Sequence, residues 1–294
     1  MRAVVTAYGK INLLLDVLRK REDGFHEVTM VMQAVKLADY VAVKAAEENV
    51  IISNTQYLPT NQDNLAMKAV LLMQQEFPQL PPLCVNLEKY IPVAAGMAGG
   101  SSDCAATMMG INALFQLGLD QKDLMALGAK LGSDIPFCFG TATALATGRG
   151  EYITPLPDCP KLYLVLIKPR FGVSTAGVYK NLRAKEIQDH PDVASYIKSL
   201  CLGDKANVLK GMYNALERST FELKPTVKEI KEQLYEDGAK YVLMSGSGPT
   251  TFAAFEHKDE AYTFYRKIKR KYFKVIFTET MDTRAMESRV KLYE

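Results

Sequence analysis

The stretch from Pro92 to Thr107 constrains the fold of this chain most, and it reads PVAAGMAGGSSDCAAT. Its glycines lie among alanines that barely shield the backbone, and an apolar helical pattern, CAATMMGINALF, begins inside it. The first four amides of a helix lack partners within the helix, and the helix dipole places about half a positive charge there. Small residues that lead into a helix therefore predict a site where backbone amides bind a phosphate group.

A tight turn in which Ser101 or Ser102 caps the helix is the alternative interpretation of this stretch. Three glycines, the flanking alanines and two serines exceed what a cap requires, so we favour phosphate binding. The stretch is not a Walker loop, because no lysine follows its last glycine, and it lacks the glycine spacing of a dinucleotide-binding motif.

Composition excludes several other classes of protein. A hydrophobic fraction of 48% and a charged fraction of 23% are typical of a globular enzyme, and a net charge of +3 is too small to indicate nucleic-acid binding. Five cysteines without a CxxC pair and three histidines without an HExxH motif indicate neither a disulfide framework nor a catalytic zinc. With no leader and no apolar run of about 18 residues, we expect a cytoplasmic protein that binds neither nucleic acid nor membranes.

The length of 294 residues and a break at 156–162, LPDCPKL, predict two domains over residues 1–156 and 157–294. In the first domain the patterns predict strands at 3–17, 28–37, 40–45, 50–53, 83–90 and 137–151, and helices at 63–77, 104–115 and 121–132. In the second domain, strand, glycine turn, strand, helix and strand follow one another, with the turn at Ser245–Thr250. This order predicts an α+β layer with helices on one face of an antiparallel sheet.

Polar residues in apolar surroundings are the candidates for function. Lys10 and Asn12 stand in an apolar strand, where they either reach solvent or point into a cleft. Asp134, between a helix end and a proline, is either a turn cap or a carboxylate held in a cleft. Phe25, next to His26 after a glycine turn, is either a buried ring at a strand start or part of a site. The residues alone leave these alternatives open.

Three segments resemble the motifs of the GHMP kinases, the small-molecule kinases named for galactokinase and the homoserine, mevalonate and phosphomevalonate kinases. They are AYGKINLLLDV, PVAAGMAGGSSDCAAT and MSGSGPTTFA, and they occur in the family's order over nearly the whole chain. The resemblance implies a two-domain α+β fold, with a ribosomal-protein-S5-domain-2-like N-terminal domain and a C-terminal ferredoxin-like layer. It also implies ATP-dependent phosphorylation of a small-molecule alcohol, with Mg²⁺ accompanying the ATP.

The resemblance places Lys10 and Asp134 at the family's catalytic lysine and aspartate positions, which favours the cleft for both. A carboxylate that accepts the hydroxyl proton and an ammonium that stabilises the developing alkoxide suit phosphoryl transfer. Asn12, in the first motif, is implied to hydrogen-bond the substrate.

Within the family, the segments DGFHE, GSDIPFC and GVSTAGVY most resemble the members that phosphorylate a cytidine-containing sugar alcohol in the non-mevalonate route to isoprenoids. Phe25, where the family commonly has Tyr, and Tyr179 are implied to stack on the cytosine, and His26 is implied to read its edge. The other residues implied on the substrate side are Ser174, Thr175, Gly246, Ser247 and Gly248.

The residues implied to contact ATP are Asn64, Pro92, Ala95, Gly96, Met97, Ala98, Gly99, Gly100, Ser101 and Ser102. Helix capping explains Asn64 nearly as well. Ala98 replaces a more frequent glycine, and a positive φ at this position would strain an alanine. Ser101 or Ser102 is the implied protein ligand of Mg²⁺.

Two other functions stay open: a GHMP kinase of the homoserine or mevalonate type, and a non-catalytic nucleotide-binding protein of the same fold. The DGFHE segment and Tyr179 argue against the first, because a flat aromatic slot suits a nucleobase and not a small aliphatic alcohol. The presence of both Lys10 and Asp134 argues against the second. The sequence does not decide between a monomer and a homodimer.

Overall fold

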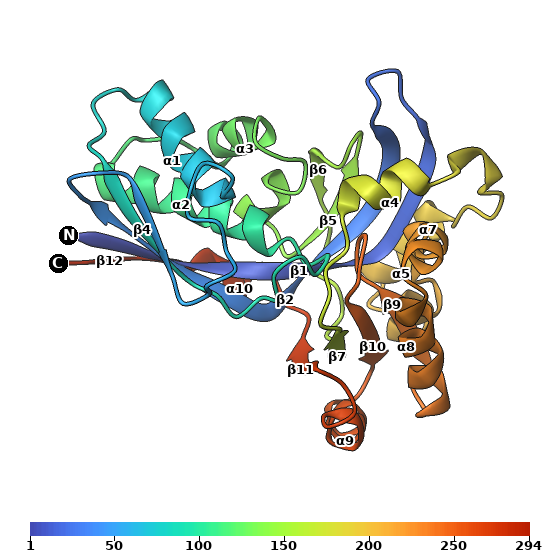
Figure 1. Cartoon of the computed structure of the whole chain (residues 1–294). Coiled ribbons are helices and arrows are strands. Elements are labelled where there is room, and N and C mark those ends of the chain that lie inside the picture. Colours follow the sequence, from blue (N-terminus) through green and yellow to red (C-terminus); the bar gives the residue numbers. More distant parts are fainter.

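The first sheet is built on one long hairpin of β1 (Arg2–Lys20) and β2 (His26–Ala45) (Figure 1). The structure is a computed structural model that describes residues 1–294. The other strands of this sheet are β3 (Val50–Ser53), β4 (Leu83–Glu88), β5 (Thr143–Thr147), β6 (Tyr152–Pro155), β8 (Tyr213–Asn214) and β12 (Val290–Tyr293). The eight strands follow the order β12-β1-β2-β4-β3, while β5 pairs with β2 and β6, and β8 pairs with β1.

The two strands predicted at 28–37 and 40–45 form the single strand β2. β1 stays paired across the junction, with Tyr8 opposite Ala38 and Ala7 opposite Asp39. A register shift between Tyr8 and Lys10 absorbs the irregularity. Pairing with a neighbouring strand therefore overrides the local break in the pattern.

β1 has apolar residues on both faces because both faces are covered. Val5 and Leu15 belong to the core that lies under helices, whereas Ile11 and Leu13 belong to a second core shared with the C-terminal half. A strand that is buried on both sides reads as a continuous apolar run rather than an alternating one. A polar side chain in the middle of β1 is consequently enclosed by the protein.

Three helices cover one face of the first sheet: α1 (Leu65–Glu76), α2 (Gly99–Phe115) and α3 (Gln121–Ala129) (Figure 1). α2 packs on β1 and β2 through small buried residues, and a Cβ atom at Gly110 would lie 3.0 Å from Val43 Cγ2. Small residues thus let the glycine-led helix lie close to the strand that carries Lys10.

The strand predicted at 137–151 is wrong over its first part. Pro136–Phe139 form a short 3-10 helix, η1, and β5 begins only at Thr143. Proline holds φ at about −65° and has no amide to donate to a sheet, so it starts a helical turn instead. This turn begins two residues after Asp134.

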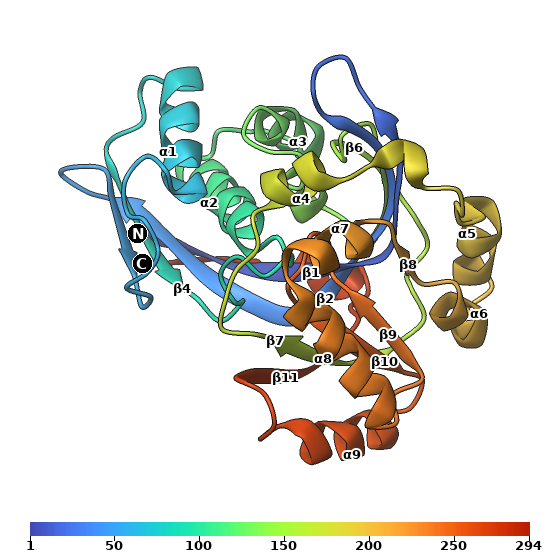
Figure 2. The ribbon, with the colours of Figure 1, turned by 45° about the vertical axis from the view of Figure 1, so that its right-hand side comes forward.

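The second sheet contains four antiparallel strands in the order β11-β7-β10-β9. Their bounds are Tyr163–Lys168 for β7, Tyr241–Met244 for β9, Thr251–Phe255 for β10 and Lys274–Glu279 for β11. Two helices, α8 (Pro225–Glu236) and α9 (Lys258–Ile268), cover one face of it through Ile230, Leu234, Phe264 and Ile268 (Figure 2). The β-α-β-β-α-β order confirms the predicted ferredoxin-like layer.

Shorter helices and the C-terminal strand join the two halves. The helices are α4 (Thr175–Asn181), η2 (Ala184–Glu186), α5 (Val193–Cys201), α6 (Lys205–Lys210), α7 (Leu216–Leu223) and α10 (Arg284–Glu287). β12 returns to β1 and brings the two termini side by side, with Tyr293 opposite Arg2 (Figure 1). None of the helices combines the length and the apolar character of a membrane span.

Candidate active site

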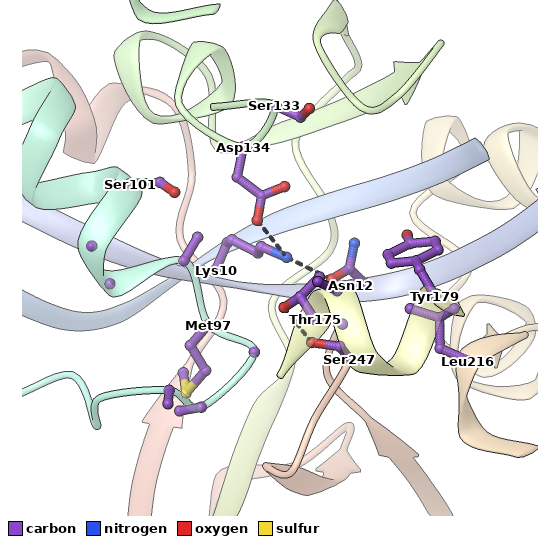
Figure 3. Close-up of a pocket in the computed structure, with 18 of the residues that line it drawn as sticks. Lys10, Asn12, Met97, Ser101, Ser133, Asp134, Thr175, Tyr179, Leu216 and Ser247 are labelled. Carbon is purple, nitrogen blue, oxygen red and sulfur yellow. Dashed lines mark hydrogen bonds and ion pairs between the residues drawn. The ribbon is translucent and has the colours of Figure 1, made fainter. Parts of the chain in front are cut away.

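A cavity of about 760 Å³ lies where the glycine-rich loop, the β1–β2 hairpin, α4 and the second glycine turn meet (Figure 3). Most of the predicted site residues line it: Lys10, Asn12, Phe25, His26, Pro92, Ala95, Gly96, Met97, Ala98, Gly99, Gly100, Ser101, Asp134, Thr175, Tyr179, Gly246 and Ser247. Four of them do not: Asn64, Ser102, Ser174 and Gly248. Segments that are far apart in the sequence therefore share one cavity.

Lys10 and Asn12 are two residues apart on β1 and point to the same side of the strand. The Nζ of Lys10 donates to Asn12 Oδ1 at 2.7 Å, and Asn12 Nδ2 lies 3.4 Å from the sulfur of Met30. Lys10 is only 4% exposed and Asn12 is fully buried, so neither side chain reaches bulk solvent. Both point into the cleft (Figure 3).

Asp134 faces Lys10 from the turn between α3 and η1 (Figure 3). Its Oδ2 lies 3.5 Å from Lys10 Nζ, and its side chain is 35% exposed, which leaves it accessible to a substrate. The turn is held through the backbone instead, because Cys138 Sγ donates to the Asp134 carbonyl oxygen at 3.3 Å. The carboxylate is thus paired with a buried ammonium and available for chemistry.

The glycine-rich loop enters α2 through backbone conformations that small residues adopt. Gly96 has φ +73° and Ala98, which precedes the helix, has φ +55°. The first hydrogen bond of the helix runs from the Ser102 amide to the Ala98 carbonyl at 2.8 Å. The amides of Gly99, Gly100 and Ser101 make no hydrogen bond within the protein, and these residues line the cavity. This cradle of free donors fits the phosphate groups of ATP.

The two serines after the glycines have different surroundings. The Ser102 hydroxyl is buried and donates to the Tyr8 carbonyl oxygen at 2.5 Å, so it is already used. Ser101 faces the cavity (Figure 3). No group of three His, Cys, Asp or Glu side chains is arranged to hold a metal ion. The donors present fit a Mg²⁺ ion that takes most of its ligands from phosphates and water, with Ser101 as the serine within reach of the cavity.

The glycine-rich loop and the second glycine turn are in direct contact. A Cβ atom at Gly96 would lie 2.2 Å from the Ser245 carbonyl oxygen, and the Ser245 hydroxyl donates to the Gly96 carbonyl at 2.9 Å. Gly248 packs against Met244 behind this contact, so it supports the turn without lining the cavity. On the cavity side, Ser247 Oγ lies 2.8 Å from Thr175 Oγ1 (Figure 3).

Asn64 and Ser174 act as helix caps. Asn64 Oδ1 accepts from the Ala66 amide at 2.9 Å at the start of α1, and Leu65, the next residue, lines the cavity. Ser174 Oγ accepts from the Gly177 amide at 3.2 Å at the start of α4. Both side chains therefore orient the helices that border the cavity.

Aromatic rings form the far end of the cavity. The His26 and Tyr179 rings lie 5.2 Å apart between centroids and 33° from parallel. Phe25 is 52% exposed in the β1–β2 turn, so much of its ring is open to a ligand. Burial lowers the pKa of His26, and Lys20 lowers it further, which keeps the imidazole neutral at pH 7. A neutral imidazole offers one donor and one acceptor.

Burial raises the pKa of the Tyr179 hydroxyl, and the nearby Asp134 carboxylate raises it further. Tyr179 therefore stays a neutral phenol at any physiological pH. The same carboxylate is thus close to both Lys10 and the aromatic end of the cavity.

The sequence patterns did not reveal four cations that line the cavity: Lys20, Lys89, Arg149 and Lys180. The Arg149 guanidinium lies 4.8 Å from the centroid of the Phe25 ring and is held by Glu151. No local signal marks these residues as part of a site, because lysine and arginine side chains usually face solvent. Their position at the cavity became evident only from the tertiary structure.

Lys89 is buried between two carboxylates, Asp39 and Asp103, beneath the start of α2. Burial raises the pKa of Asp103 to about 7, although Lys89 opposes the shift. Asp103 Oδ1 is buried without a hydrogen-bond partner. Two carboxylates that share one ammonium in a dry site cannot both be compensated, which explains why the proton is held.

Comparison with known proteins shows what this chain is similar to. The family model for the GHMP kinases N terminal domain matches residues 64–141, and the model for the GHMP kinases C terminal domain matches residues 196–274. A 4-diphosphocytidyl-2-C-methyl-D-erythritol kinase of Geobacillus sp. (strain WCH70) is 46% identical over 92% of this chain and 93% of that protein.

Solved structures agree with these sequence matches. A crystal structure of a 4-(cytidine 5'-diphospho)-2C-methyl-D-erythritol kinase superposes with a TM-score of 0.79 at 31% identity, over 94% of this chain and 98% of that one. A homoserine kinase from Cytophaga hutchinsonii superposes with a TM-score of 0.73 at 18% identity, over 99% and 96%. The second likeness is one of fold alone.

Proposed function

This chain belongs to the GHMP kinase family, and we propose that it uses ATP to phosphorylate the 2-hydroxyl of 4-diphosphocytidyl-2-C-methyl-D-erythritol, in the non-mevalonate route to isoprenoid precursors. The observation that carries the proposal is that one cavity holds three parts: the free amides of the glycine-rich loop, the Lys10–Asp134 pair and the aromatic end. A nucleoside triphosphate, a reacting hydroxyl and a pyrimidine base each have a complementary surface there.

The glycine-rich loop is the proposed ATP phosphate site. The free amides belong to Gly99, Gly100 and Ser101, which line the cavity at the positive end of α2. Mg²⁺, when bound to those phosphates, would neutralise charge that develops on them during transfer. We propose Ser101 rather than Ser102 as its protein ligand, because the Ser102 hydroxyl is already bonded to Tyr8.

Asp134 is the proposed proton acceptor for the substrate hydroxyl, and Lys10 the proposed partner of the resulting alkoxide. Their 3.5 Å separation lets one hydroxyl oxygen contact both groups. Asn12 fixes the Lys10 ammonium through its Oδ1 and has only a weak partner, Met30 Sδ, at its Nδ2. A substrate oxygen can replace that sulfur, which supports the predicted role of Asn12.

The rings of Phe25 and Tyr179 are the proposed stacking surfaces for cytosine, with neutral His26 at its edge. Ser247 and Thr175, whose hydroxyl oxygens lie 2.8 Å apart, line the same cavity near Asn12 (Figure 3) and are the proposed contacts for the part of the substrate between the base and the reacting hydroxyl. Kinases of the homoserine or mevalonate type act on small aliphatic alcohols, for which an aromatic slot has no use. The pairing of the buried Lys10 ammonium with a carboxylate at the cavity likewise has no structural reason to exist in a protein that only binds nucleotides.

An acceptor panel tests the proposal. The purified protein is supplied with ATP, Mg²⁺ and, in turn, the cytidine substrate, homoserine or mevalonate, and ADP release is followed by a coupled assay. We expect turnover with the cytidine substrate alone, and phosphorus NMR of the product should place the new phosphate on the 2-hydroxyl. Preference for either aliphatic alcohol, or no turnover with any acceptor, would refute it.

A further inference from the structure

We propose that Arg289, near the C-terminus, is a positioning residue that holds the turn carrying Asp134 against the strand carrying Lys10. This role rests on the proposed kinase function, because Arg289 lies behind the cavity and acts only through Asp134. In this role, the last segment of the chain helps to align Asp134 with Lys10.

The side chain of Arg289 closes the C-terminal end of η1. Its Nη1 donates to the Cys138 carbonyl oxygen at 2.8 Å, and its Nη2 donates to the Phe139 carbonyl oxygen. The last carbonyls of a helical segment have no partner within that segment. Arg289 therefore satisfies two buried acceptors that the short helix leaves free.

η1 is in turn bonded to Asp134 at its other end. The Cys138 amide donates to the Ile135 carbonyl at 2.9 Å, and Cys138 Sγ donates to the Asp134 carbonyl at 3.3 Å. Cys138 therefore links Arg289 to Asp134: its carbonyl accepts from the guanidinium, and its thiol donates to the backbone of Asp134. A displacement of η1 consequently displaces the carboxylate.

The backbone of Arg289 is bonded to the strand of Lys10. Its carbonyl accepts from the Thr6 amide at 2.9 Å, and the following residues form β12, where Val290 lies opposite Val5. Thr6 precedes Lys10 by four residues on β1. One residue therefore contacts both elements whose separation sets the 3.5 Å distance between Lys10 Nζ and Asp134 Oδ2.

Packing alone gives no reason for a cation at this position. Arg289 is 7% exposed, makes no ion pair with a carboxylate, and burial lowers its pKa. An apolar side chain of similar length fills such a site at a smaller desolvation cost. The planar guanidinium, however, holds two donors in a fixed fork, and here they reach the carbonyls of two consecutive residues.

Arg289→Met and Arg289→Lys test the role, with Lys291→Met as the control. We expect Arg289→Met to lower kcat by about 10- to 100-fold, because a misplacement of about 1 Å costs up to about 100-fold in rate, while KM for both substrates stays within about threefold. Arg289→Lys keeps a charged hydrogen-bond donor but loses the planar fork, so it should recover only part of the loss. Lys291 is exposed on β12 and leaves η1 untouched, so its replacement should leave kcat unchanged.

A double-mutant cycle separates positioning from a general loss of folded enzyme. In an Asp134→Asn background, Arg289→Met should lower kcat by less than about threefold further, because the group it positions is already disabled. An equal loss in both backgrounds, or an unchanged kcat in the single variant, would overturn the proposal. If Arg289→Met fails to fold by circular dichroism, the same cycle is run with Arg289→Lys. Wild-type protein that does not phosphorylate the cytidine substrate would refute the proposed function instead.

Discussion

Ala98 holds a backbone conformation that alanine tolerates poorly. Its φ of +55° lies in the left-handed region, and it precedes the first residue of α2. This conformation costs an alanine about 1–2 kcal/mol. A glycine adopts it without that strain, and the larger conformational entropy that glycine loses on folding offsets only part of the gain. The strain is located in the loop that we propose for ATP phosphates.

We expect Ala98→Gly to raise the free energy of unfolding by about 0.5–1 kcal/mol, because the relief of strain exceeds the added entropy of the unfolded chain. Urea unfolding at constant m-value measures the change. Ala105→Gly, in the regular part of α2, is the control and should lower stability by about 1 kcal/mol. Equal losses in the two variants would show that Ala98 is not strained.

Phe25 lacks the hydroxyl of the family's usual tyrosine but keeps the ring face. We expect Phe25→Ala to weaken binding of the cytidine substrate by about 10- to 100-fold, since stacking is worth about 1–3 kcal/mol per base, and to leave ATP affinity unchanged. Phe25→Tyr keeps the face and is the matched control. Isothermal titration with each ligand decides, and a parallel loss of both ligands in Phe25→Ala would contradict the assignment.

The glycine-rich loop and the second glycine turn work as one unit, because each fills the space that a side chain on the other would need. Neither turn is a regular element, yet together they set the position of the free amides at the start of α2. The chain positions these amides by the contact between two loops that lie about half the sequence apart.

Gly96→Ala tests this unit. The new Cβ would lie 2.2 Å from the Ser245 carbonyl at a φ of +73°, so we expect the turns to separate, with a loss of stability and at least a tenfold loss of ATP affinity, about 1.4 kcal/mol. Gly118→Ala is a matched control, because its φ is +74° and no atom lies within 4 Å of the new Cβ. It should cost stability alone, about 1–2 kcal/mol. Equal ATP affinity in both variants would contradict the role of the contact.

The buried Lys89–Asp39–Asp103 group ties the start of α2 to the first sheet, and it predicts a pH dependence of stability. The pKa of Asp103 rises from 3.8 to about 7 on folding, so between these values the folded state holds a proton that the unfolded state has released. This contribution to stability is complete below pH 3.8 and is lost as pH rises through 7.

Urea unfolding of the wild type and Asp103→Asn from pH 5 to 8 measures this dependence. We expect the free energy of unfolding of the wild type, relative to the variant, to fall by at most about 1.4 kcal/mol per pH unit, and to level off above pH 7. Parallel curves for the two proteins would show that Asp103 does not retain its proton.

We propose residues 1–156 and 157–294 as the two domains, since the second sheet begins with β7 at Tyr163. The division is not clean in space. β8 and β12 come from the second half and pair with β1, and Arg289 reaches the turn of Asp134. The second half also covers one apolar face of β1 and β2.

A fragment of residues 1–156 should therefore not fold as a stable monomer. It would leave the edge of β1 opposite β2 without its partners β8 and β12, and it would expose the face that carries Ile11 and Leu13. We expect association or aggregation in size-exclusion chromatography and no cooperative thermal transition. A monomeric fragment that unfolds cooperatively would contradict this expectation.

Much of the fold and the site followed from local patterns. The glycine-rich loop, its helix, the long strands and the ferredoxin-like order depend on backbone sterics and hydrophobic period, which are properties of neighbouring residues. The motifs around Lys10 and Asp134 indicated the family, and the comparisons confirmed it. The roles of the individual site residues stay predictions.

Other features depended on contacts between distant segments. The serine that faces the cavity, the cations Lys89 and Arg149, the strain at Ala98 and the return of β12 to β1 all follow from packing. The η1 turn replaced a predicted strand because Pro136 has no amide to offer a sheet. The local sequence around a residue determines which backbone conformations it prefers. Which side chains come into contact depends instead on how buried surfaces pack together, and residues more than a hundred positions apart contribute to those surfaces.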